Sequence, residues 1–164
     1  VRSLRNHGTD SENLHSIPGY NSRMDEIHAA VLRVKLGKVR QYIVRRRGIA
    51  RLYCQLLADL PVELPHEVPG AIHVFNQFTI LTEDRDYLAA ELQASNIATA
   101  VYYPLPLYRQ PLLSSNYPGL YLPVAERVAK HCLSLPVYPE LEDEYILKIV
   151  NVIENALKNK KPSC

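Results

Sequence analysis

Asn21 and Arg23 form the first candidate for chemistry, because both side chains can hold an anion where a helical stretch begins. A side-chain amide at a helix start adds a neutral donor to the free backbone N–H groups, and a guanidinium can grip a phosphate or carboxylate with two bonds. Judged on the residues alone, a helix cap is the better interpretation of this segment. Asn21 or Ser22 can cap the first turn, and Asp25 and Glu26 lie where carboxylates favour the helix dipole.

Tyr108 is a second candidate, in a stretch between Pro104 and Pro123 that is rich in proline and tyrosine. Such a stretch predicts a long surface loop, and long loops inside compact domains are often functional. No metal site is expected, because the histidines and cysteines form no Cys-x-x-Cys or His-x-x-x-His pair. The chain also lacks a glycine-rich phosphate loop and a nucleophile elbow. The residues therefore assign no catalytic group within this chain.

A helical run from about Arg23 to Asp59 must position Asn21. Its apolar residues follow helical spacing on two faces, so both faces need cover. Gly37 costs helix stability and predicts a kink or break near it. One sheet can cover only one face, which predicts a homodimer through this run, with antiparallel helices. The two stripes are Ile27, Ala30, Val31 and Val34, and Leu32, Leu36, Val39, Ile43, Ala50, Cys54 and Leu57.

The remainder alternates β-rich and helical segments, which predicts the α+β class. The expected architecture is a long N-terminal helix or kinked helix pair packed on a small, roughly three-stranded, mainly antiparallel sheet with further helices. In the terminal helix, Ile146, Ile149, Val150 and Ile153 form the buried stripe, and Leu88 and Leu92 face inward from an earlier helix. Strands are expected at residues 71–81, 97–103 and 133–137, and helices at 84–95, 126–132 and 143–158, before a charged tail.

The chain has 164 residues, 47% of them hydrophobic, and a formal net charge of +2. No apolar run is long enough to cross a membrane. Cys54, Cys132 and Cys164 are widely spaced and indicate free thiols in a reducing cytoplasm. Basic residues crowd the helical run, without an acidic residue between Ile27 and Ala58. A solvated helix face is the preferred interpretation for most of these arginines, and no nucleic-acid motif or interleaved aromatic residue supports nucleic-acid binding. These basic residues are Arg33, Lys35, Lys38, Arg40, Arg45, Arg46, Arg47 and Arg51.

Several motifs occur in a fixed order along the chain. They include Leu-Arg-Asn-His-Gly at residues 4–8, Gly-Tyr-Asn-Ser-Arg-Met-Asp-Glu-Ile-His-Ala-Ala at 19–30, Asn-Gln-Phe at 76–78, Val-Tyr-Tyr-Pro-Leu-Pro-Leu at 101–107, Gln-Pro at 110–111 and Leu-Ser-Leu-Pro-Val-Tyr-Pro at 133–139. In this order, the set resembles the DegT-type sugar aminotransferases. These are pyridoxal-phosphate enzymes of the fold-type-I aspartate aminotransferase superfamily.

The resemblance implies roles for individual residues in an intact homodimeric enzyme. Asn21 would hydrogen-bond the phosphate of pyridoxal 5'-phosphate in the opposite subunit's active site. Arg23 and Tyr108 become candidate substrate contacts, although family members commonly carry a histidine where this chain has Tyr108. The substrates implied are a nucleotide-linked keto-sugar and glutamate as the amino donor. Residues 1–22 would form an arm that crosses between domains, and residues 23–164 the C-terminal small domain.

The resemblance also implies that the Schiff-base lysine lies upstream of Leu4, in a large domain that this chain lacks. None of the lysines present stands in the family's place, so the chain is expected to be a fragment that binds no cofactor and does not transaminate alone. Two alternatives stay open: a stand-alone interaction module derived from this domain, or the small domain of a dehydratase branch without the lysine. Nucleic-acid binding through residues 45–47 is a third and weaker alternative. The lysines are Lys35, Lys38, Lys130, Lys148, Lys158, Lys160 and Lys161.

Overall fold

The computed structural model describes residues 1–10 and 14–159. The chain divides into two compact units, Val1–Arg40 and Gln41–Cys164. The part of the predicted charged tail beyond residue 159, with Cys164, lies outside the described residues. Within the described ranges, no helix is both long and apolar enough to span a membrane. Cys54 and Cys132 are free thiols, as the spacing of the cysteines predicts.

The first unit begins with a short helix, α1 (Arg2–Arg5), followed by a segment that folds back on itself. Asn6 and Asn21 form an isolated antiparallel bridge. On either side of it, the Tyr20 N–H donates to the carbonyl oxygen of Leu4 at 2.7 Å, and the Ser22 N–H to that of Arg5 at 2.9 Å. Residues 4–8 and 19–22 therefore lie side by side. The expectation of an irregular arm did not anticipate these bonds.

Helix α2 (Glu26–Leu36) is capped by Asp25 and not by Asn21 or Ser22. The Asp25 carboxylate accepts the backbone N–H of His28 at 2.8 Å and contacts the His28 ring at 2.6 Å. The predicted cap was wrong because the backbone of residues 20–22 is already bonded to residues 4–7, which delays the first helical turn. Asp25 is the next residue with a side chain suited to capping.

The helical run breaks at Gly37 and Lys38, where a kink or break was predicted, so the single long helix that was one of the two expected forms is not present. The second helix, α3 (Val39–Leu56), buries Ile49, Ala50 and Tyr53. By contrast, the described residues of α2 include no buried side chain, and Ile27 and Val34 are 77% and 71% exposed. Of the predicted second stripe, Ala50 and Leu57 are buried, whereas its members in α2 are exposed.

The sheet of the second unit pairs β1 (Phe78–Leu81) with β2 (Cys132–Leu135) in antiparallel register, Phe78 opposite Leu135 and Ile80 opposite Leu133. The prediction of three strands was wrong for the described residues. The strand predicted at residues 97–103 contributes only one isolated bridge, between Ala100 and Ser134. That bridge has both ladder bonds, of 2.8 and 3.2 Å, but the pairing does not extend into a strand.

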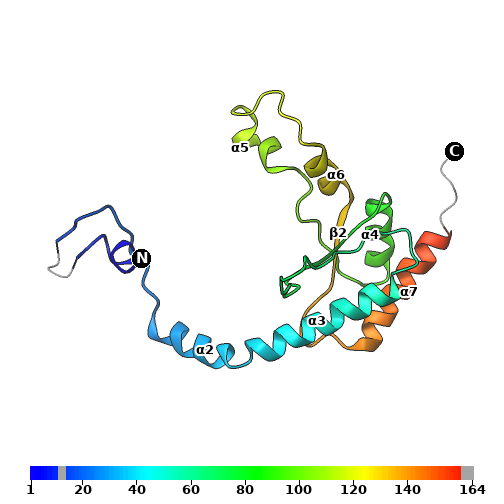
Figure 1. Ribbon diagram of the computed structural model, residues 1–164, viewed down its shortest axis with the longest axis horizontal. Coiled ribbons are helices and arrows are strands. Elements are labelled where there is room, and N and C mark those ends of the chain that lie inside the picture. Colours follow the sequence, from blue (N-terminus) through cyan, green and yellow to red (C-terminus); the bar gives the residue numbers. More distant parts are fainter. Residues whose placement is uncertain (11–13, 160–164) are drawn as a thin grey trace. The chain divides into compact units, whose positions relative to one another are not determined.

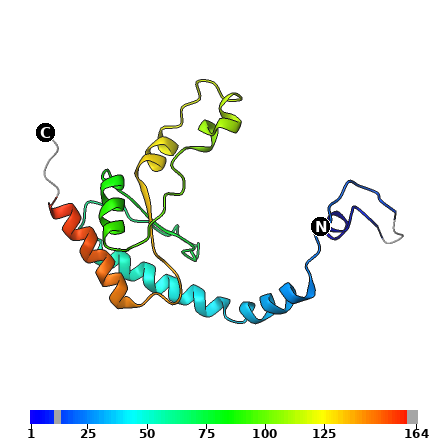
Figure 2. The same ribbon diagram turned by 180° about the vertical axis from the view of Figure 1, so that it is seen from behind.

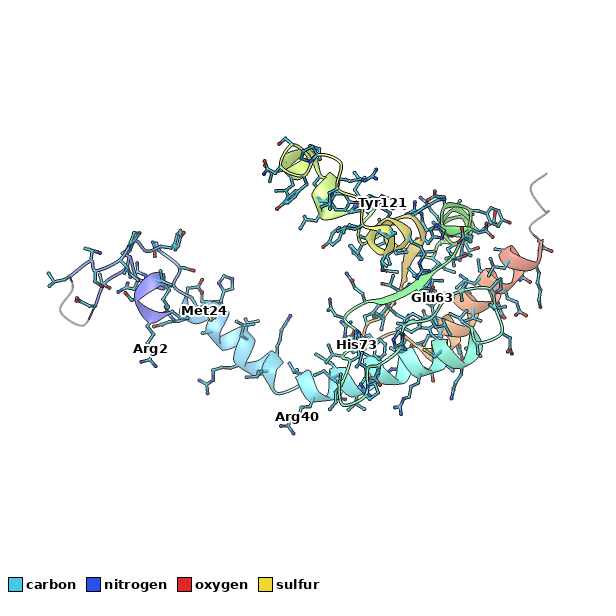
Figure 3. The ribbon with its side chains drawn as sticks, turned by 45° about the horizontal axis from the view of Figure 1, so that its top comes forward. Arg2, Met24, Arg40, Glu63, His73 and Tyr121 are labelled. Carbon is cyan, nitrogen blue, oxygen red and sulfur yellow. The ribbon has the colours of Figure 1, made fainter. Side chains whose placement is uncertain are left out.

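The first predicted strand is also shorter than expected, because side chains take the backbone groups that a ladder would use. Arg47 donates to the carbonyl oxygen of His73 at 2.7 Å, and the Glu67 carboxylate accepts the N–H of His73 at 2.8 Å. Phe75 then adopts a left-handed backbone conformation, with φ of 46°. A bulky residue seldom adopts this conformation, and it breaks an extended chain. Figure 3 shows His73 beside α3.

Helices cover the sheet and complete the core. Helix α4 (Arg85–Ala94) packs on α7 (Asp143–Asn159), as Figure 1 shows. Every predicted inward residue of these two helices is buried: Leu88, Leu92, Ile146, Ile149, Val150 and Ile153. Asn96, just after α4, has a left-handed backbone conformation with φ of 58°. Asparagine adopts this conformation after a helix more readily than most residues do. The helix predicted at residues 126–132 is α6 (Pro123–His131).

Between Val101 and α6, the chain forms the predicted long loop. It contains a 3-10 helix, η1 (Leu107–Arg109), and a one-turn helix, α5 (Pro111–Ser114). Both ribbon views show this segment extending away from the sheet (Figures 1 and 2). Its leucines and tyrosines are largely exposed, including Leu107 at 73% and Leu112 at 85%. The loop therefore presents apolar groups that the described chain leaves uncovered.

Candidate functional site

Two glycines allow the segments that carry the Asn21 motif to approach closely. Gly8 has φ of 76°, and a Cβ built there would lie 1.7 Å from the carbonyl oxygen of Ile17. A Cβ on Gly19 would lie 2.1 Å from the backbone nitrogen of Gly8. Any other residue at either position would push the two segments apart. This close approach explains why the motif at residues 4–8 ends with Gly8 and the motif at residues 19–30 begins with Gly19.

Asn21 and Arg23 lie beside each other and are exposed. The Arg23 Nε donates to Oδ1 of Asn21 at 3.2 Å. That bond engages the amide oxygen and leaves the amide nitrogen, which has no partner among the described residues, as a donor on an exposed side chain. A guanidinium and an amide N–H group next to each other suit an anion with several oxygen acceptors, such as a phosphate.

Tyr108 lies in the second unit and is held by its own loop. Its hydroxyl donates to the Glu126 carboxylate and accepts the backbone N–H of Leu122 at 3.2 Å. Arg109 also pairs with Glu126, Nε to Oε1 at 2.5 Å, and its guanidinium lies 5.9 Å from the centre of the Tyr108 ring. The hydrogen bond to Tyr108, followed by the charge of Glu126, raises the pKa of Arg109 above its ordinary value. This network ties η1 to α6.

A surface cavity of about 550 Å³ brings together three of the motifs that are far apart in the sequence. Its lining includes Asn76 and Gln77, Ala100 and Tyr102, and residues 134–138. Its polar groups are amides and hydroxyls, and none of its lining residues carries a formal charge. Pockets with mainly apolar walls and a few polar groups are typical of small-molecule sites. The sequence did not predict this cavity, because its walls meet only in the folded chain.

The walls of the cavity are held by side chains of α3. Arg46 Nη1 donates to the carbonyl oxygen of Val137 at 2.9 Å and to those of Phe75 and Asn76 at 3.3 Å each. Further along the same helix, the Tyr53 hydroxyl donates to the carbonyl oxygen of Pro136 at 3.1 Å. Burial raises the pKa of Tyr53 well above its ordinary value, so the hydroxyl stays a donor.

The three consecutive arginines are therefore not a solvated face, and that interpretation was wrong for residues 45–47. All three are half-buried, and each binds a different part of the chain. Arg45 pairs with Asp143 at 2.9 Å and donates to the carbonyl oxygen of Leu141, while Arg47 pairs with Glu67. The other basic residues of the run are exposed, as predicted: Arg33, Lys35, Lys38, Arg40 and Arg51.

A sequence profile identifies the family to which these motifs belong. The profile of the DegT/DnrJ/EryC1/StrS aminotransferases matches residues 1–154, nearly the whole chain. The chain belongs to the DegT/DnrJ/EryC1/StrS aminotransferase family. Members of this family depend on pyridoxal phosphate. The described residues of this chain contain no cluster of three or more His, Cys, Asp or Glu able to hold a metal.

Individual family members resemble this chain along most of its length. It is 41% identical, over 157 residues, to the UDP-N-acetyl-3-dehydro-alpha-D-glucosamine 3-aminotransferase of Acidithiobacillus ferrooxidans, covering 96% of this chain and 42% of that enzyme. Its fold matches that of Streptomyces venezuelae DesV, solved with a ketimine intermediate, with a TM-score of 0.92, 36% identity, and coverage of 98% and 44%. NtdA of Bacillus subtilis, solved with bound PMP, matches with a TM-score of 0.82, 27% identity, and coverage of 96% and 38%. The chain thus spans less than half the length of these relatives.

Proposed function

We propose that this chain is the C-terminal small domain of a pyridoxal-phosphate-dependent aminotransferase, which converts a keto group on a nucleotide-linked sugar into an amine with glutamate as donor. The observation that carries the proposal is the family match over residues 1–154. The identity of 41% to an enzyme named for a UDP-linked dehydro-sugar supports this substrate class. Pyridoxal phosphate, when bound, supplies the electron sink for the reaction.

The residues of the first unit fit the phosphate group of that cofactor. Asn21 offers the free amide N–H group of an exposed side chain, and Arg23 orients that side chain through the bond between Nε and Oδ1. The backbone bridge between Asn6 and Asn21 fixes where this donor stands. In the proposed homodimer, Asn21 serves the active site of the partner subunit, and Arg23 contributes positive charge to the same anion or to the substrate.

Tyr108 is the proposed substrate contact of the second unit. Its hydroxyl is engaged by Glu126 and Leu122, so in this arrangement its ring, rather than its hydroxyl, is free to contact a ligand. A tyrosine ring packs well against the apolar face of a sugar or base. Family members commonly have a histidine in its place, and that shorter side chain would not reach Glu126 as the Tyr108 hydroxyl does.

The chain by itself is expected to be inactive, because none of its lysines stands in the family's Schiff-base position. Mixed with pyridoxal phosphate, the purified chain should show no saturable absorbance change of one-to-one stoichiometry. Slow adducts on exposed lysines are the expected background. A stoichiometric chromophore that is lost on substitution of one lysine would contradict this assignment.

A chimaera tests the proposed function directly. The matching segment of the Acidithiobacillus ferrooxidans enzyme is replaced by this chain, and glutamate-dependent amination of its UDP-linked keto-sugar is followed as release of 2-oxoglutarate. We expect activity in the chimaera and a loss of at least about 10-fold in cofactor affinity for Asn21→Ala, since one hydrogen bond to a charged group contributes about 1.5–3 kcal/mol. Asn151→Ala, an exposed asparagine of α7, is the matched control.

The experiment with the chimaera tests the substrate class and the role of Asn21 separately. A folded chimaera that binds the cofactor but does not aminate any UDP-linked keto-sugar would overturn the proposed substrate class. Equal cofactor affinity for the Asn21→Ala and Asn151→Ala chimaeras would remove Asn21 from the phosphate site while leaving the class of enzyme in place.

A further inference from the structure

The Glu126 carboxylate joins the long loop before α6 to α6 itself. One of its oxygens, Oε1, accepts the Tyr108 hydroxyl and also pairs with Nε of Arg109 at 2.5 Å, so two successive residues of η1 meet on one atom. The Tyr108 hydroxyl in turn accepts the backbone N–H of Leu122 at 3.2 Å. A phenol whose hydroxyl both donates and accepts is held at its far end, while the backbone holds its near end. The Tyr108 ring therefore has a fixed direction.

Helix α6 is itself fastened to the rest of the second unit, and Figure 1 shows it between the loop and the sheet. Arg127 donates to both oxygens of Glu63, at 2.7 and 3.4 Å. At the other end of the helix, the buried ring of His131 lies 3.1 Å, Nδ1 to Oε1, from Glu83. Glu126 thus stands on a helix whose position is fixed by two further contacts, and it passes that position on to the loop.

Other tyrosines of the same loop are not anchored in this way. The hydroxyl groups of Tyr117 and Tyr121 have no hydrogen-bond partner among the described residues, and these side chains are 50% and 63% exposed. Tyr108, by contrast, is half-buried. The anchor at Glu126 therefore distinguishes Tyr108 from its neighbours of the same residue type.

We propose that Glu126 is a positioning residue, which holds the Tyr108 ring in the place where that ring contacts the substrate. The inference rests on the proposed function, in which Tyr108 is a substrate contact. It names the group that makes a tyrosine effective at this place, a carboxylate on α6 that the phenol hydroxyl reaches. The contact with substrate is made through the ring, because the hydroxyl already has a donor and an acceptor inside the chain.

Steady-state kinetics of the chimaera with its UDP-linked keto-sugar separate positioning from a general loss of structure. Glu126→Ala should raise KM for the sugar by about 5-fold with little change in kcat, because a hydrogen bond is lost from a group that binds but does not react. Tyr108→Phe removes the same bond from the other side and should have a similar effect. The double variant should lose no more than Tyr108→Phe alone, since both changes break one interaction. Tyr108→Ala, which removes the ring itself, should lose more.

A conservative variant and two matched controls complete the series. Glu126→Gln keeps an acceptor oxygen for the phenol and should recover part of the loss in KM. Glu144→Ala removes an exposed glutamate that also lies in the first turn of its helix, α7, so it matches the change in helix-end charge. Tyr117→Phe removes the hydroxyl of an unanchored tyrosine in the same loop. Neither control should change KM.

Nuclear magnetic resonance of the isotope-labelled chain reads the anchor without any reaction. In Glu126→Ala, the ring signals of Tyr108 should move toward those of the exposed Tyr117, and exchange of the Leu122 amide should speed up by about 5-fold. Glu144→Ala should leave both in place.

An active chimaera whose KM is unchanged by Glu126→Ala would overturn the inference and leave the proposed function in place. Losses that multiply in the double variant would also overturn it, because they would show that Glu126 acts apart from Tyr108. If Glu126→Ala does not fold, Tyr108→Phe and Glu126→Gln decide by the same measurements. A chimaera that aminates no UDP-linked keto-sugar would overturn the proposed function, and the ring signals of Tyr108 would still decide whether Glu126 holds the ring.

Discussion

The hydroxyl of Tyr53 donates a hydrogen bond of 3.1 Å to the carbonyl oxygen of Pro136, a residue 83 positions further along the chain. The Tyr53 ring is fully buried and stacks on Phe78, with 4.9 Å between ring centres. One side chain thereby joins α3, the sheet and the segment that follows β2. This segment is also a wall of the cavity.

Tyr53→Phe should lower the free energy of unfolding by about 1–2 kcal/mol, because the Pro136 carbonyl group loses its donor while the ring stays packed. Urea unfolding of the chain measures the difference. Tyr42→Phe, at a half-buried tyrosine of the same helix, is the matched control and should change little. Equal losses for the two variants would show that the hydrogen bond to Pro136 contributes nothing specific.

The pair of Arg47 and Glu67 should make stability depend on pH. The hydrogen bonds from Arg47, and then from the His73 N–H, lower the pKa of Glu67 below its ordinary value. A lowered folded-state pKa means that the contribution is present above the unfolded-state pKa and is lost as pH falls through the folded-state value. Glu67→Gln should therefore be less stable than the unaltered chain near neutral pH, and the gap should close in acid.

Thermal melting across the acid range checks this dependence. Glu91→Gln, at an exposed glutamate of α4, is the control and should follow the unaltered chain at every pH. The expected direction would be contradicted by a stability difference between Glu67→Gln and the unaltered chain that grows as pH falls.

Gly8→Ala should open the paired segments of the first unit, since its Cβ would overlap the carbonyl group of Ile17. Hydrogen exchange of the bonded amides of His7, Tyr20 and Ser22 should speed up by about 10-fold or more, which corresponds to about 1.4 kcal/mol. Gly119→Ala is a matched control, because Gly119 also has positive φ, of 74°, but open space around it. Unchanged exchange in Gly8→Ala would mean that the pairing is not maintained by this close approach.

Self-association through α2 is the expected mode of assembly. Because Ile27, Val31 and Val34 are exposed, we expect the chain to form dimers that bury them. Light scattering over a concentration series should give a dimer mass, and Val31→Asp and Val34→Asp should each shift it toward the monomer. Val124→Asp, at an exposed valine of α6, should not. A chain that stays monomeric at high concentration, whatever the substitution, would exclude this interface.

The helices and the family could be predicted from the sequence, because both leave local or ordered signals. The stripe of Ile146, Ile149, Val150 and Ile153 follows the helical period and is buried. The motifs around Asn21 and Asn76 stand in the family's order, and the profile match confirms that membership. Gly37 marks the helix break, since its low helix propensity acts on its own neighbours.

The cavity and its supports could not be predicted, because they depend on contacts between distant residues. Arg46 reaches backbone carbonyl groups, and a carbonyl acceptor is present at every residue, so no sequence pattern marks the partner. Bonds of this kind, from Arg46 to Phe75 and Asn76 and from Arg47 to His73, take residues 71–77 out of the expected strand. The cap at Asp25 was missed for a related reason, since the backbone groups of Tyr20 and Ser22 are bonded to residues 4–7 and the helix begins only after them.

The turn at Gly37 and Lys38 has a practical consequence for limited proteolysis. Lys38 is an exposed trypsin site between two helices, whereas Arg45, Arg46 and Arg47 have their side chains engaged in the folded second unit. Exposed connections are cut first by proteases. A brief trypsin digest should therefore separate the segment that carries Asn21 and Arg23 from the second unit. The body that keeps the cavity would then be available for crystallisation without that segment.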